Sequence, residues 1–216
     1  MIKVFTLCIV LSLSFLSCSW SEPKQEDTAE ELAEEGMEAF DARSYRVAIE
    51  IFHRLRDWYP FSEHATLAEL KIADSYYHLR RYDRAISAYD AFEGLHPGSE
   101  AMPYVIHQIG LSYFRRLDAA NRDQTSAKKA LETFERLIRL YPDSPYAREA
   151  EKNAIECRKS LAGHELVVGV FYFKSKRYSA ALRRFRGIVT NYPDVVTIRD
   201  QALQYIERSE SALRAR

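Results

Sequence analysis

One residue pattern recurs four times along this chain of 216 residues, and it limits the fold more than any other feature does. Each copy has a tyrosine or alanine, an alanine three residues later, an aromatic residue four further on and a proline eight beyond that. The copies run over residues 45–60, 82–97, 127–142 and 178–193. Upstream of each copy, a small residue precedes one or two aromatic residues, at Gly36, Ala73, Gly110 and Gly169. Four similar units predict a stack of two-helix repeats.

The pattern resembles the tetratricopeptide repeat, a helix–turn–helix unit of about 34 residues. The resemblance implies an all-α fold: a tetratricopeptide-repeat (TPR) superhelix of four repeats with a C-terminal capping helix over 197–214. The alanine of each second helix is expected to face the small residue of the first, because overpacking at this crossing would cost about 1–3 kcal/mol. The aromatic residue is expected to fill the space toward the next repeat. The proline ends the second helix, since it disfavours helical geometry in the residue before it.

Two intervals depart from the even repeat and predict how the chain is divided. The second helices of repeats two and three lie 45 residues apart while the first helices keep a step of 37. The extra residues predict an exposed loop near 118–126, with Thr125 or Ser126 as the N-cap of the following helix. The stretch 145–176 has no proline beyond its first residue and predicts one long helix. We therefore expect an N-terminal half over 29–142 and a C-terminal half over 143–216.

The first residues predict export and a lipid anchor. A short, positively charged start precedes an apolar run that is too short to span a bilayer, which is typical of a signal peptide over residues 1–17. The next residue, Cys18, follows a sequence that resembles a bacterial lipobox, which implies its lipidation. Cleavage without lipidation is the alternative, because Phe15 and Leu16 differ from the residues that the lipobox prefers. The polar, acidic segment 18–28 is expected to be a disordered tether.

Charge and residue types limit the function classes. The formal net charge is zero, but the charges are unevenly distributed along the chain. Positions 22–41 contain nine acidic residues and one lysine, and positions 158–186 contain eight basic residues and one acidic residue, Glu165. Opposite charge at the two ends of the fold indicates that the two ends bind different partners. No long basic stripe with interleaved aromatic residues occurs, so nucleic acid is not expected as a partner. The six histidines lack metal-ligand spacing and no phosphate loop or nucleophile elbow occurs, so we expect no metal, no cofactor and no enzymatic activity.

The stretch 122–147 resembles the BamD family, the lipidated TPR components of the bacterial outer-membrane β-barrel assembly machine. The loop in repeat three and the long helix after it extend the likeness over nearly all of the mature chain. The resemblance implies a non-catalytic periplasmic scaffold, anchored by lipid to the outer membrane. Such a scaffold would dock on the POTRA domains of BamA, contact other lipoproteins of the machine, and receive the C-terminal segments of unfolded outer membrane proteins.

The first helices supply candidate residues for binding such an extended segment. The residue after the buried aromatic position, and the residue three positions earlier, are expected to line a groove. In repeats one to three these are Met37 and Phe40, Asp74 and Tyr77, and Leu111 and Phe114. Phe114 is expected to be exposed and its neighbour Tyr113 to be buried. The alternative is that superhelical curvature buries the groove rings against the neighbouring first helices.

The second helix of repeat four supplies the candidate surface for docking on BamA. It carries Arg183, Arg184 and Arg186 away from the predicted core face. Arg184 is favoured for an ion pair with the partner, from its place in the family's pattern. A solvated arginine is the alternative.

Two other functions stay open from the sequence. One is another periplasmic TPR adaptor, such as a pilotin-like protein or a cell-division coordinator, which would share the Tyr-Pro-x-Ser-x-Tyr-Ala segments but not the loop in repeat three. The other is a structural lipoprotein that bridges envelope layers, which would need no aromatic groove.

Overall fold

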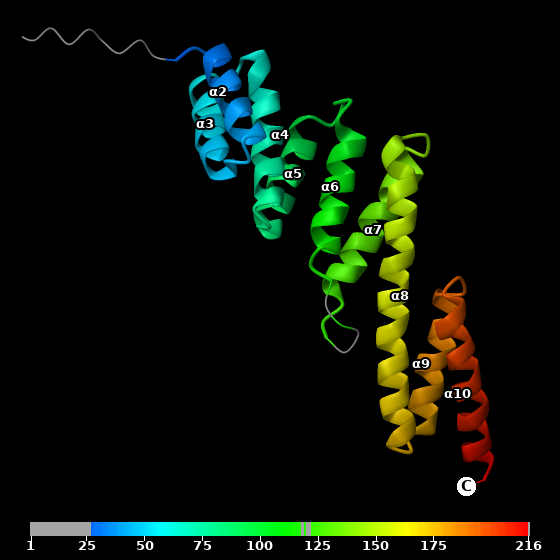
Figure 1. Ribbon diagram of the computed structural model, residues 1–216. Coiled ribbons are helices and arrows are strands. Elements are labelled where there is room, and N and C mark those ends of the chain that lie inside the picture. The colour runs from blue at the N-terminus through cyan, green and yellow to red at the C-terminus, as the bar shows by residue number, and fades with distance from the viewer. Residues whose placement is uncertain (1–26, 118, 120–121, 216) are drawn as a thin grey trace, which may run out of the picture.

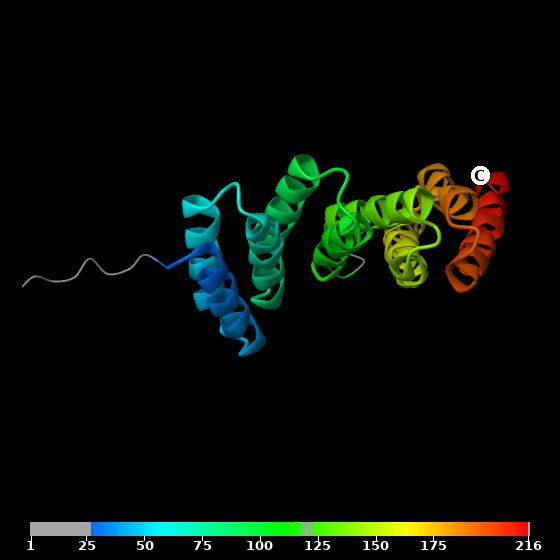
Figure 2. The same ribbon diagram turned by 90° about the horizontal axis from the view of Figure 1, so that it is seen from above.

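The computed structural model describes residues 27–117, 119 and 122–215, and the regular elements within these ranges are nine helices (Figure 1). They are α2 (Ala29–Asp41), α3 (Tyr45–Trp58), α4 (Glu63–His78), α5 (Tyr82–Leu95), α6 (Met102–Phe114), α7 (Thr125–Leu140), α8 (Pro145–Lys174), α9 (Tyr178–Asn191) and α10 (Val196–Arg214). Successive antiparallel pairs stack along the molecule, from α2 and α3 to α8 and α9, with α10 covering the last pair (Figures 1 and 2). The predicted TPR fold is confirmed. The predicted signal peptide, Cys18 and most of the predicted tether lie outside the described residues.

In repeats one, three and four, the first helix packs closely on its own second helix because a glycine leaves room for an aromatic ring. The three heavy atoms nearest to a Cβ placed on Gly36 all belong to Phe52, the closest at 2.5 Å. The pairs Gly110 with Phe134 and Gly169 with Phe185 repeat this distance. The ring, rather than the alanine, lies nearest the glycine. The same rings also share core clusters with the following helix, Phe52 with Ala68, Phe134 with Ala150 and Phe185 with Ala202, so the expectation that they fill the space toward the next repeat is confirmed.

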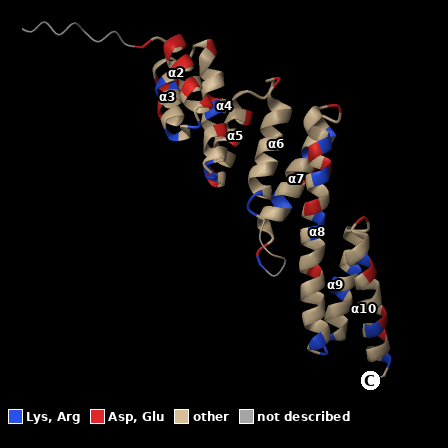
Figure 3. Cartoon of the chain, in the orientation of Figure 1, with Lys and Arg blue, Asp and Glu red and all other residues tan. Residues whose placement is uncertain are grey.

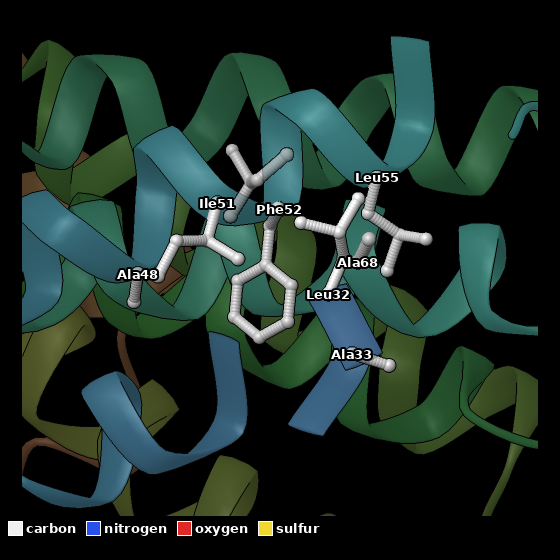
Figure 4. Packing of buried hydrophobic residues seen from close by; sticks show 8 residues of the cluster. Leu32, Ala33, Ala48, Ile51, Phe52, Leu55 and Ala68 are labelled. Carbon is white, nitrogen blue, oxygen red and sulfur yellow. The ribbon is translucent and has the colours of Figure 1, made fainter. Parts of the chain in front are cut away.

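The hydrophobic core passes from one repeat to the next. Phe52 is fully buried in a cluster that contains Leu32 of α2, Leu55 of α3 and Ala68 of α4 (Figure 4). Residues of the next first helix thus complete the core of each repeat, as expected for units that cannot bury their apolar faces alone.

The turns inside repeats one, two and four share one backbone conformation. Arg43, Arg80 and Lys176 have φ angles of 59°, 57° and 58°, in the left-handed region. Each residue lies two positions before the tyrosine that starts the second helix. This conformation turns the chain from the first helix into the second within three residues.

The loop of repeat three begins after α6 and is held at its end by Gln124. This residue is buried, and its Nε2 atom donates to the carbonyl oxygens of Ala119 and Arg122, each at 3.2 Å. Its Oε1 atom accepts from the hydroxyl of Ser160 on α8 at 3.0 Å. The predicted N-cap is wrong: Gln124, not Thr125 or Ser126, precedes the first helical residue. The Gln124 side chain does not cap α7, and the Asp123 carboxylate accepts from the Thr125 amide at 3.3 Å instead.

The long helix predicted over 145–176 is confirmed as α8, which contains 30 residues. It packs against α6 and α7 on one side and against α9 and α10 on the other. The last two repeats are therefore joined through one continuous element.

The last two residues of the predicted tether take part in the fold. Thr28 caps α2 in a reciprocal arrangement. Its hydroxyl accepts from the backbone amide of Glu31, and the Glu31 carboxylate accepts from the backbone amide of Thr28. The hydroxyl of Tyr59 donates to the carbonyl oxygen of Asp27 at 2.8 Å. No described helix combines the length and the apolar character needed to cross a membrane.

Candidate peptide-binding face and partner surface

Half-buried aromatic rings lie in the last turn of the first helices. In three repeats the ring packs edge-on against the tyrosine that begins the second helix, in an arrangement that aromatic pairs prefer. The pairs are Phe40 with Tyr45 at 5.4 Å, Tyr77 with Tyr82 at 5.6 Å and Phe173 with Tyr178 at 5.5 Å between ring centroids. The tyrosine of the repeat signature thus supports the candidate ring of its own repeat.

The candidate rings also contact polar groups, several of them from the next repeat. The ammonium group of Lys71 lies 4.4 Å from the centroid of the Phe40 ring, and His78 packs edge-on against the same ring at 5.7 Å. The Nε atom of Arg115 donates to the hydroxyl of Tyr77 at 3.4 Å. Cationic side chains therefore lie beside the rings of repeats one and two.

Five of the six predicted groove residues are half-buried. These are Met37, Phe40, Tyr77, Leu111 and Phe114. They are neither sealed in the interior nor fully exposed, because each packs against its own or the neighbouring repeat while keeping part of its surface in solvent. The first helices thus present a partly apolar face.

The contrast predicted between Phe114 and Tyr113 is wrong. Both side chains are half-buried. Ala127 replaces the supporting tyrosine in repeat three, and the Phe114 ring instead packs edge-on against the core ring of Phe134 at 6.2 Å. Phe114 is therefore tied to the core more strongly than the sequence indicated.

Asp74 is not a groove residue, which corrects the prediction. It is 4% exposed, and one of its oxygens, Oδ1, accepts from the hydroxyls of Tyr89 at 2.6 Å and Tyr104 at 2.7 Å. Lys71 donates to its other oxygen at 3.2 Å. Burial, and then the nearby Asp74 carboxylate, raise the pKa of the Tyr89 and Tyr104 hydroxyls, which keeps both as donors. The network bonds α4 and α5 to the first helix of repeat three.

The three candidate arginines on α9 have different surroundings. Arg184 donates to both carboxylate oxygens of Glu165 on α8, at 3.2 and 3.0 Å. Arg186 pairs with Glu210 on α10 at 2.8 Å. Arg183 is exposed and forms no ion pair within the described ranges. Figure 3 shows basic residues on α9, far along the molecule from the acidic residues of α2.

Arg184 also lines a groove that the sequence did not predict. The groove has a volume of about 260 Å³. It brings Gln124, at the end of the repeat-three loop, and Lys128, in the first turn of α7, together with Arg184 and Tyr192 of repeat four. Burial, and then the charge of Glu165, raise the pKa of Tyr192. The long helix α8 forms the floor, because its residues 161, 164 and 165 line the same groove. The loop of repeat three and the helix α9 therefore contribute to one surface.

Two residues of this surface, Glu165 and Gln124, were not predicted from the sequence. For Glu165 the sequence does contain an indication. Glu165 is the sole acidic residue in the basic stretch 158–186, and it is the residue that pairs with Arg184. A lone acidic residue in a basic run is a candidate for an internal ion pair. Gln124 had no comparable signal, because its partner Ser160 lies 36 residues away.

Within the described ranges, no group of three or more His, Cys, Asp or Glu side chains is placed to hold a metal ion. Cys157 is fully buried on α8, and burial raises the pKa of its thiol to about 12. A thiol of this kind is a poor nucleophile at neutral pH.

Comparison with known proteins agrees with this architecture. The TPR2AB domain of yeast Sti1 matches with a TM-score of 0.53 and 16% identity over 85% of this chain and 73% of that chain, which supports the fold alone. Three similar relatives are each named outer membrane protein assembly factor BamD. They come from Pasteurella multocida (28% identical, covering 89% of this chain and 78% of the relative), Vibrio cholerae (28%, 91% and 87%) and Neisseria meningitidis serogroup B (27%, 98% and 82%).

A family model described as "YfiO: Outer membrane lipoprotein" matches residues 25–215, which is nearly the whole described part of the chain. By this match the chain belongs to the YfiO family of outer membrane lipoproteins, and the relatives named BamD match it over most of their length.

Proposed function

We propose that this chain is a non-catalytic scaffold of the machinery that assembles β-barrels in the outer membrane, held on the periplasmic side by a lipid on Cys18. The family match and the name that the relatives carry support this role. Stacked helical hairpins offer extended surfaces for partners, which suits a scaffold. Among the described residues no feature favours a pilotin-like adaptor, a cell-division coordinator or a purely structural lipoprotein.

The face formed by the first helices is proposed to receive the C-terminal segments of unfolded outer membrane proteins. The observation that carries this proposal is that the rings of Phe40, Tyr77 and Phe114 are half-buried at the same position of three successive repeats, with Lys71 beside Phe40 and Arg115 beside Tyr77. Aromatic side chains of an extended segment would pack against the rings. Its terminal carboxylate would pair with one of the cations.

The surface around Arg184 is proposed to dock on the POTRA domains of BamA. Glu165 holds the guanidinium in one orientation, while the Arg184 side chain stays 43% exposed. An oriented and still accessible guanidinium can bind a carboxylate of a partner at little further entropic cost. Arg183 and Arg186 would add charge at the rim, and other lipoproteins of the machine would bind elsewhere on the scaffold.

Purification of the full chain from detergent-solubilised outer membranes tests this function. The proposal predicts that a BamA-type barrel protein is recovered with the wild-type chain and is reduced when Arg184 is replaced by Glu. A matched change on the opposite end of the molecule, Arg46→Glu, is expected to leave the recovery unchanged. Recovery of the wild-type chain without any barrel protein would contradict the scaffold function.

A further inference from the structure

Exposed apolar side chains form a row along one edge of the molecule. The last residue of the second helix is Trp58 in repeat one, Leu95 in repeat two and Leu140 in repeat three, with exposed fractions of 52%, 67% and 54%. Phe61, in the turn after Trp58, is fully exposed. Each precedes or lies within the proline turn that leads to the next repeat. Single exposed apolar residues are ordinary, but one in each of three successive turns is a pattern.

The fourth repeat breaks this pattern. Its second helix ends in Asn191, a polar residue at the position of Trp58, Leu95 and Leu140. In Figure 1 the first three turns lie along the upper ends of the helices, and the turn before α10 stands lower in the view. The exposed apolar residue of this fourth turn is Val196, the first residue of α10, at 53%. An apolar last residue of the second helix is therefore a feature of the first three repeats.

The chain enters the fold at this same edge. Asp27, the first described residue, is held by the hydroxyl of Tyr59 at 2.8 Å and pairs with Arg54 at 3.5 Å. Both partners are close in sequence to Trp58. Only eight residues lie between Cys18 and Asp27, so the nine steps between their Cα atoms can span at most about 30 Å. A lipid on Cys18 would hold the first turn near the membrane surface.

The two edges of the molecule differ in chemistry. The turns at the opposite ends of the helices carry basic residues, among them Arg80, Arg81 and Arg116, which line one hollow of about 440 Å³ with Asp83. At the apolar edge, two arginines lie within one turn of Trp58, and both are paired with acidic residues: Arg54 with Asp27 and Glu35, and Arg56 with Asp57. Tryptophan and phenylalanine favour the boundary between lipid headgroups and acyl chains, where part of the ring is wet and part is apolar.

We propose that the apolar edge, formed by Trp58, Phe61, Leu95 and Leu140, lies against the surface of the lipid bilayer, with the basic edge turned away from it. The occupant of this edge is the boundary layer of phospholipid, which would take the side chains of Trp58 and Phe61 between its headgroups. The edge then orients the whole scaffold, because the rigid stack of repeats follows its first turn. This proposal rests on the lipid anchor proposed above.

Fluorescence of Trp58 in vesicles tests the orientation. The chain has two tryptophans, so Trp20→Phe leaves Trp58 as the single indole. The full chain with this change is reconstituted into vesicles of phosphatidylethanolamine and phosphatidylglycerol whose acyl chains carry bromine near the headgroup. We expect Trp58 to lose much of its emission relative to vesicles without bromine. We also expect the additional changes Phe61→Ser and Leu95→Ser to restore part of that emission.

A matched indole at the opposite end of the helices is the control. Phe171, in the last turn of α8, is 63% exposed, and Phe171→Trp combined with Trp20→Phe and Trp58→Phe moves the single indole there. Its emission is expected to be unaffected by bromine. Equal quenching at both positions, or stronger quenching at position 171, would overturn the proposed orientation. A chain that does not float with the vesicles contradicts the anchor and the orientation together, whereas a floating chain with unquenched Trp58 contradicts the orientation alone.

Discussion

The ring of Phe52 lies so close to Gly36 that a methyl group on Gly36 would sit 2.5 Å from its Cε1 atom. Because Phe52 is fully buried, the ring cannot move aside without disturbing the first cluster. We expect Gly36→Ala to lower the free energy of unfolding by about 1–3 kcal/mol, measured by chemical denaturation.

A helical glycine with open space is the matched control for that substitution. Gly187 on α9 has no heavy atom within 4 Å of a Cβ placed on it, so Gly187→Ala should gain up to about 1 kcal/mol from helix propensity alone. If both variants shifted stability in the same direction, the close packing of glycine and ring would not be what joins the two helices of a repeat.

Removal of the Asp74 carboxylate is expected to destabilise the junction between repeats two and three. Asp74→Ala leaves the buried hydroxyls of Tyr89 and Tyr104 without their acceptor. A buried donor without a partner costs about 1–3 kcal/mol, so we expect a loss of roughly 2–4 kcal/mol in the free energy of unfolding. Asp74→Asn keeps an acceptor oxygen and should lose clearly less. An alanine variant as stable as wild type would show that the network does not hold α4 against α6.

The stability of the fold is expected to fall in mild acid because of His107. Its side chain is 3% exposed beside Tyr146, its Nε2 atom has no hydrogen-bond partner, and burial lowers its pKa despite the nearby Glu149. The unfolded chain therefore takes up a proton near the ordinary pKa of about 6.5, before the folded chain does. Stability is full above that pH and declines as the pH falls toward the lowered pKa of the folded state.

Chemical denaturation between pH 5 and 8 measures this dependence. His107→Phe, which keeps a ring against Tyr146, should flatten the pH profile. Some dependence should remain from His53, whose pKa burial also lowers. Identical profiles for wild type and the His107→Phe variant would rule out His107 as the main group.

The ion pair between Arg184 and Glu165 is expected to matter for docking more than for stability. Both side chains are partly exposed, so Arg184→Ala should change the free energy of unfolding by less than about 1 kcal/mol. The double change Arg184→Glu with Glu165→Arg restores an internal pair but reverses the charge offered to a partner. We expect it to keep stability and to lose the BamA-type barrel protein in purification. Full recovery of that partner by the double variant would assign Arg184 a structural role only.

The sequence predicted those features that recur at fixed spacing. The TPR class, the long helix α8 and the capping helix α10 follow from landmarks such as Gly36, Phe52 and Pro60, whose counterparts return in every repeat. The capping helix begins at Val196, one residue before the predicted start. Periodic packing is local, so the residues that produce it are close in sequence and can be recognised without coordinates.

The features that the sequence did not predict are those in which one repeat differs from the others. Asp74 occupies a position that is apolar in the other repeats, and its partners lie 15 and 30 residues away. Phe114 lost its supporting tyrosine to Ala127 and took a new neighbour in Phe134. These contacts depend on side chains that are distant in the sequence and meet only in the folded chain. A pattern shared by all repeats cannot reveal contacts that only one repeat makes.

The affinity of the full chain for an extended peptide that ends in phenylalanine tests the central claim most directly. Titration by fluorescence anisotropy should show that Phe40→Leu with Tyr77→Leu weakens binding about tenfold or more, as for aromatic anchors at the centre of an interface. Phe171→Leu, which changes an exposed ring away from the candidate face, should leave the affinity unchanged. Unchanged affinity in the folded Phe40 and Tyr77 double variant would contradict the proposal that the first helices receive the segment.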